Sequence, residues 1–202
     1  MLRLEDAIDR LDAIHVQVLR SETFRGVRAV PTAATGVIAL AAAVVQAAVV
    51  PPSEPADFVE FWIAVAAIAA TIGALEIVRS AVRGGPSALR RAAVVMRQVL
   101  PALGVGAIVT VVLLQTGDRA TTLLPGLWAL CFATALAAAQ PFLPASIALA
   151  TGFYFLAGVI LLVPDCREPL PEPLGMGLTF GIGQLLVAVA LRRSAREIAD
   201  GS

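Results

Sequence analysis

Long stretches without a charged residue are the feature that most constrains the fold of this chain. Four of them occur, at Ala29–Ser53, Gln98–Gly117, Ala120–Pro164 and Pro173–Leu191. Each is long enough for a helix to cross a bilayer, which takes roughly 17–25 apolar residues. Charged residues make up 15% of the sequence, against about 25% in an average soluble domain. The sequence therefore predicts an all-α, polytopic membrane protein.

Turn-forming residues divide the apolar sequence into six predicted spans. The turn at Gln140–Pro144 splits the longest charge-free run in two. The segment Arg83–Ser87, with two glycines and a proline, is predicted to break the chain, and Ser87 is predicted to cap the next helix. The predicted spans are residues 31–50, 58–78, 99–116, 122–140, 143–163 and 174–191.

The first residues differ in character from the spans. Between Leu2 and Arg20, apolar residues recur at steps of three and four, which predicts an amphipathic helix. Acids outnumber arginines there, whereas helices that bind anionic lipid are rich in cations. We therefore expect this helix to dock on protein. The predicted organisation is a cytoplasmic amphipathic helix (1–28), a six-helix transmembrane domain (29–191) and a cytoplasmic tail (192–202).

The arginines indicate the orientation of these spans. All fifteen Lys+Arg positions are arginine, and six spans place all of them on one side except Arg119 and Arg167. Cytoplasmic segments carry the excess of cations, so both termini are predicted to be cytoplasmic. The sequence lacks Lys and Asn and is rich in Ala, Val, Leu and Arg, which is typical of a GC-rich bacterial genome. The expected location is the bacterial cytoplasmic (inner) membrane.

Catalytic and cofactor chemistry has little support in the sequence. Intramembrane hydrolysis needs polar groups at depth, such as a Ser–His pair, two aspartates or a zinc site. The one histidine, His15, precedes every predicted span, and no span contains aspartate. A dense basic run with interleaved aromatic residues, typical of nucleic-acid binding, is also lacking. We expect no enzyme activity, no cofactor or metal, and no nucleic-acid partner.

Five polar residues within the spans are candidate functional residues. They either line a weakly polar intramembrane cavity or bond to neighbouring groups: Gln46, Glu76, Gln140, Tyr154 and Gln184. A carboxylate in a span is costly and often functional. Glu76, however, lies near the cytoplasmic end of its span, and an interfacial ion pair with Arg79 or Arg83 also explains it.

Closely spaced glycines mark the sixth span. They are Gly175, Gly177, Gly181 and Gly183, which form small-xxx-small patterns together with Thr179. Such spacing lets helix backbones approach closely. The seam that it predicts lies either within the bundle or between two copies in a homo-oligomer.

The start of the chain carries a resemblance. An amphipathic segment is followed by His15–Arg28, with Arg20-Ser21-Glu22-Thr23-Phe24, and then by a first span that contains Pro31 and Gly36. The chain resembles a set of uncharacterised bacterial six-span integral membrane proteins. The resemblance implies this architecture and no activity.

Two functional hypotheses follow from the sequence. The first is a non-enzymatic membrane component that engages a cytoplasmic or membrane protein partner through its cytoplasmic face, because polar sequence concentrates there. The second is a small-molecule permease or lipid-binding protein with a weakly polar cavity between its spans. An enzyme that acts on lipids at the membrane interface ranks behind both.

Overall fold

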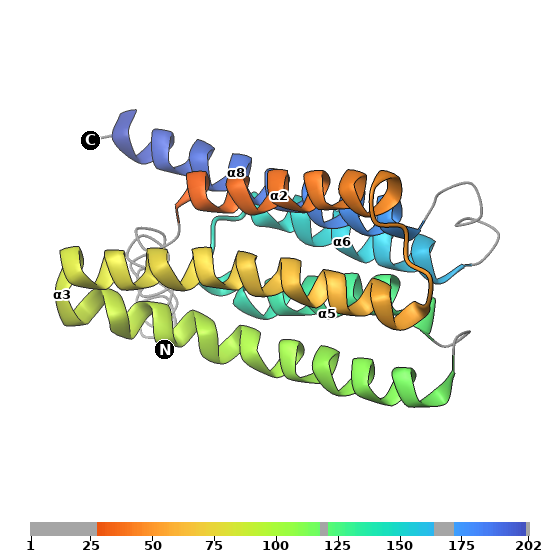
Figure 1. Cartoon of the computed structure of the whole chain (residues 1–202). Coiled ribbons are helices and arrows are strands. Elements are labelled where there is room, and N and C mark those ends of the chain that lie inside the picture. The colour runs from red at the N-terminus through yellow and green to blue at the C-terminus, as the bar shows by residue number, and fades with distance from the viewer. Residues whose placement is uncertain (1–27, 118–120, 164–171, 201–202) are drawn as a thin grey trace, which may run out of the picture.

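The computed structural model describes residues 28–117, 121–163 and 172–200, and all regular structure within these ranges is helical (Figure 1). The elements are α2 (Ala29–Ala48), α3 (Pro55–Thr116), α5 (Leu124–Ala139), the 3₁₀ helix η1 (Gln140–Phe142), α6 (Ile147–Leu162) and α8 (Glu172–Asp200). The predicted amphipathic helix at Leu2–Arg20 lies outside the described residues.

Five helical stretches are long and apolar enough to cross a membrane. They are Ala29–Ala48, Pro55–Ser80, Ala93–Thr116, Leu124–Phe142 and Glu172–Glu197. A sixth helix, Ile147–Leu162, is apolar but has only 16 residues, or about 24 Å at 1.5 Å per residue. The all-helical class is confirmed, and these features are those of a multi-pass membrane protein. That the chain crosses the membrane six times stays a prediction.

Helix α3 folds back on itself. A straight helix would place Phe58 and Leu113 about 80 Å apart, yet both belong to one hydrophobic cluster around Trp62. Figure 1 shows the two halves running in opposite directions. We call Pro55–Ser80 the first arm and Ala93–Thr116 the second arm.

The reversal of α3 occurs without the predicted break in helical structure. The backbone is helical throughout residues 81–92, so the prediction of a separate helix beginning after Ser87 is wrong. Gly84, Gly85 and Pro86 lie between the two arms. Glycine and proline are the residues at which helices bend most readily.

Helices α2 and α8 form the most extensive contact in the bundle, although they are far apart in the sequence. A Cβ atom added at Gly36 would lie 2.9 Å from the carbonyl oxygen of Gly181, and one added at Gly181 would lie 3.1 Å from that of Gly36. Gly177 lies equally close to α2, where an added Cβ would overlap the methyl group of Ala43. Small residues therefore set the distance between these two helices.

A second glycine contact joins α5 and α6. A Cβ atom at Gly126 would lie 2.9 Å from the carbonyl oxygen of Gly158, and one at Gly158 would lie 3.0 Å from that of Gly126. The side chains of Leu130 and Leu162 close over the two glycines. This contact was not predicted from the sequence, because each helix contributes one glycine and neither contains a glycine repeat.

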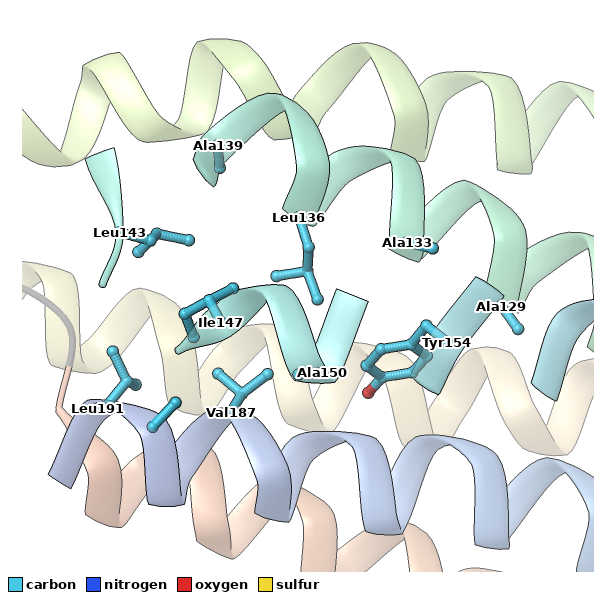
Figure 2. Packing of buried hydrophobic residues seen from close by; sticks show 11 residues of the cluster. Ala129, Ala133, Leu136, Ala139, Leu143, Ile147, Ala150, Tyr154, Val187 and Leu191 are labelled. Atoms are coloured by element: carbon cyan, nitrogen blue, oxygen red, sulfur yellow. The ribbon is translucent and has the colours of Figure 1, made fainter. Parts of the chain in front are cut away.

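Two clusters of buried side chains form the core. One joins α5, α6 and α8 around Leu136, Ile147, Tyr154 and Leu191 (Figure 2). The other joins α2, α3, α5 and α8 around Phe58, Trp62, Leu124 and Met176.

The arms of α3 are peripheral to this core. Only 6% and 11% of the residues in their most apolar stretches are buried, against 56% in α8. Helix α8 is therefore central, and the two arms present apolar surface to their surroundings.

We expect Gly177→Ala to lower the free energy of unfolding by about 1–3 kcal/mol, the usual cost of overpacking. Its methyl group would overlap Ala43 and lie 3.0 Å from the carbonyl oxygen of Ala39. Gly152→Ala is the matched control, because nothing lies within 4 Å of the added methyl group. Unfolding in mixed micelles measures both. Equal stability of the two variants would show that the α2–α8 contact does not limit stability.

Candidate functional site

Tyr154 lies at the centre of the bundle and is fully buried. Its hydroxyl group donates to the carbonyl oxygen of Phe180 at 3.4 Å and shares a side-chain hydrogen bond with Gln184. The ring lies against Gly183, where an added Cβ atom would overlap it, and 4.8 Å from the ring of Phe132, centroid to centroid. In Figure 2 the hydroxyl group points toward α8. The structure thus brings together two predicted cavity residues and one predicted seam glycine.

Gln46 belongs to α2, is 1% exposed and contacts Trp62 of the first arm of α3. The indole N–H of Trp62 donates to its Oε1 atom at 2.7 Å. An indole N–H buried away from water needs an acceptor. The amide of Gln46 supplies it, so this polar group is used within the chain.

A second indole forms an equivalent bond between α5 and the second arm. The N–H of Trp128 donates to Oγ1 of Thr110 at 2.8 Å, and that hydroxyl donates to the carbonyl oxygen of Gly106 at 2.8 Å. Neither tryptophan was predicted from the sequence to pair with a polar residue. Such a pairing could have been expected, because each indole has one N–H donor that needs an acceptor at membrane depth.

Glu76 forms an ion pair with Arg28 rather than with Arg79 or Arg83. The Nε atom of Arg28 lies 3.1 Å from Oε1 of Glu76, and the side chains are 54% and 14% exposed. Arg28 immediately precedes α2, so the pair joins two helices instead of two turns of one helix. This pair balances the charge of the carboxylate within the chain.

The remaining candidate residues lie apart from one another. Gln140 begins η1 and is only partly buried. Gly175 faces α6, where Leu161 would lie 3.1 Å from an added Cβ atom, and Gly177 and Gly181 face α2. All four seam glycines are thus covered by other parts of the same chain.

The described interior holds no unsatisfied polar group that awaits a ligand. Every buried side-chain nitrogen and oxygen atom in the part of the chain that the structure describes has a hydrogen-bond partner. Within the same residues, no group of three or more His, Cys, Asp and Glu side chains is placed to hold a metal ion.

The arginine-bearing end of the bundle is the remaining candidate surface. The start of α2, the bend of α3 and the last turns of α8 lie at the same end of the bundle (Figure 1). These segments carry Arg28, Arg79, Arg83, Arg90, Arg91, Arg97, Arg192, Arg193 and Arg196. On α8, an open hollow of about 390 Å³ is lined by Val189 and the last three of these arginines.

Thr110→Val is expected to lower the free energy of unfolding by about 1 kcal/mol, because the indole N–H of Trp128 loses its acceptor in an environment without water. Thr134→Val is the matched control. Thr134 also donates to a carbonyl oxygen four residues earlier, that of Leu130, at 2.8 Å, so its hydroxyl group bonds within α5. Unfolding in mixed micelles compares them, and an equal loss in both variants would contradict the role of the Trp128 bond.

Glu76→Gln and Arg28→Gln should each destabilise the protein by up to about 1 kcal/mol, and the double variant should lose no more than one single variant does. The reason is that each substitution removes the same ion pair. A double-mutant cycle of unfolding free energies measures the coupling. Strictly additive losses would show that the pair does not hold α2 to α3.

No protein-family model, curated protein or solved structure matches this chain. The resemblance to uncharacterised bacterial six-span membrane proteins therefore stays a prediction.

Proposed function

We propose that this chain is a six-span protein of the bacterial cytoplasmic membrane, with both termini in the cytoplasm. In this proposal it is a non-enzymatic component that engages a protein partner through its arginine-bearing end. The segregation of arginine is the observation that carries the proposal. Nine arginines lie in the described segments at one end of the bundle, and cytoplasmic ends of membrane proteins carry the excess of cations.

The way in which the buried polar groups are paired supports a packing role for them. Gln46 is bonded to Trp62, and Tyr154 is bonded to Gln184 and Phe180. A permease needs polar groups that remain available to a substrate in the interior. The exposed cations at the end of the bundle are more accessible to another molecule than these residues are, which favours the partner hypothesis over the permease hypothesis.

The short helix α6 is compatible with a sixth crossing. Backbone hydrogen bonds continue for a turn before it, from Ile147 to Pro144 and from Ala148 to Ala145, and the bond from Val163 to Val159 extends its other end. The ordered segment is therefore longer than the 16 residues of the helix. Bilayers also thin locally around short spans at modest cost.

We expect cysteine labelling to place residue 53 outside the cell and residues 87 and 194 inside it, as six crossings require. In a background in which Cys131 and Cys166 are replaced by alanine, Ser53→Cys should react with a membrane-impermeant thiol reagent in intact cells. Ser87→Cys and Ser194→Cys should react only after the membrane is opened. Labelling of either of these two in intact cells would contradict the proposed topology.

Partner engagement is tested by crosslinking in native membranes followed by affinity purification of the full chain. We expect Arg79→Gln/Arg83→Gln/Arg97→Gln, or deletion of residues 1–25, to reduce recovery of a specific partner at least about tenfold, since each lost charge contact is worth about 1 kcal/mol or more. Arg119→Gln/Arg167→Gln is the control, because these arginines lie on the predicted opposite side. An unchanged partner set in all variants would remove the basis of the proposal.

A further inference from the structure

The hollow at the end of α8 lies on the outer face of the helix. At 3.6 residues per turn, Val189, Arg192, Arg193 and Arg196 fall within an arc of about 100°, and together they line the hollow. Val189 is 47% exposed and the three arginines are exposed. Among the side chains that the structure describes, the ion pair is between Arg28 and Glu76, and no carboxylate of that set pairs with these arginines.

An exposed apolar stripe runs into this hollow along the same arc of α8. Leu178 and Ile182 are each 39% exposed, and their positions fall within about 20° of Val189 around the helix axis. The neighbouring helices contact other faces of α8. Helix α2 contacts Gly177 and Gly181, and Tyr154 of α6 contacts Gly183. The stripe is thus a continuous surface, apolar along its length and cationic at one end.

The length of the stripe matches one leaflet of a bilayer. Leu178 and Val189 are eleven positions apart, which corresponds to about 16 Å along the helix axis. Half of the hydrocarbon core is about 15 Å thick. The predicted span 174–191 is centred between Ile182 and Gly183, so Arg192, Arg193 and Arg196 lie about 14–20 Å from its centre along the helix axis, between the edge of the hydrocarbon core and the headgroup region.

The charge of this site selects an anionic ligand. Three arginine residues line the hollow, and guanidinium groups bind phosphate oxygens through paired N–H donors. Glu197, the acidic side chain that the structure describes in this part of α8, lies at the edge of the arc. Basic pockets next to membrane helices bind anionic lipid headgroups in the same way.

We propose that α8 carries a binding site for an anionic phospholipid. The phosphate lies among Arg192, Arg193 and Arg196, and an acyl chain lies along Leu178, Ile182 and Val189. The site rests on the membrane placement in the proposed function and is independent of the protein partner. It also holds whichever end of the bundle faces the cytoplasm.

Native mass spectrometry of the purified full chain in detergent tests the site by titration with phosphatidylglycerol and phosphatidylcholine. We expect phosphatidylglycerol to bind at least about tenfold more tightly. At about fivefold per arginine, Arg192→Gln/Arg193→Gln/Arg196→Gln should weaken its binding by about 100-fold. Arg79→Gln/Arg83→Gln/Arg97→Gln removes three exposed arginines at the same end of the bundle and should change binding less than about threefold. An equal loss of phosphatidylglycerol binding in both variants would overturn the proposal, because the change in net charge alone would then explain the loss.

Three further measurements separate a lipid from a soluble phosphate and a local effect from misfolding. Ile182→Trp fills the apolar stripe and should weaken phosphatidylglycerol binding, whereas Ile108→Trp, at an exposed position of the second arm, should not. Glycerol phosphate at millimolar concentration should not displace the lipid. Arg192→Lys/Arg193→Lys/Arg196→Lys keeps the charge but loses the paired N–H donors, and should bind phosphatidylglycerol more tightly than the glutamine variant and less tightly than the unmodified chain. Displacement by glycerol phosphate together with unchanged binding by Ile182→Trp would show a headgroup site only and overturn the lipid assignment.

Discussion

The scarcity of water in the hydrocarbon core of a bilayer is the constraint on which this structure depends. Where water is absent, backbone N–H and C=O groups must be paired within the chain, which favours continuous helices. The same constraint applies to side chains. The indoles of Trp62 and Trp128 donate to Gln46 and Thr110, and every buried polar side-chain atom in the described residues has a partner. Charge is accordingly displaced to the ends of the helices.

Without a hydrophobic driving force between helices in lipid, close contact depends on small residues. Helix α8 uses this twice. Gly177 and Gly181 bring its backbone to that of α2, and Gly183 makes room for the ring of Tyr154 from α6. The contact between Gly126 and Gly158 joins α5 to α6 in the same manner. The result is a core centred on α8, with the arms of α3 at its periphery.

The pairing of the interior polar residues also bears on the function of the protein. The residues predicted to line an interior cavity are spread over separate contacts: Gln46 beside Trp62, Glu76 beside Arg28, and Tyr154 beside Gln184. Among the described residues, the arginine-bearing end presents exposed charged side chains. There, the stripe on α8 combines exposed apolar side chains with Arg192, Arg193 and Arg196. The lipid and partner proposals both draw on this end of the molecule.

The sequence by itself determined which segments are apolar helices, because lipid imposes a minimum length and excludes charge. The predicted span at residues 31–50 corresponds to the helix Ala29–Ala48. The sequence also determined where the arginines lie along the chain. Only the tertiary structure decided which helices touch: that α2 packs on α8, that the two arms of α3 meet again near Trp62, and that Glu76 reaches Arg28 across a helix boundary. Helical periodicity specifies the face that a residue occupies but not the helix opposite it. That choice depends on the shapes of surfaces that are distant in the sequence and meet only when the bundle assembles.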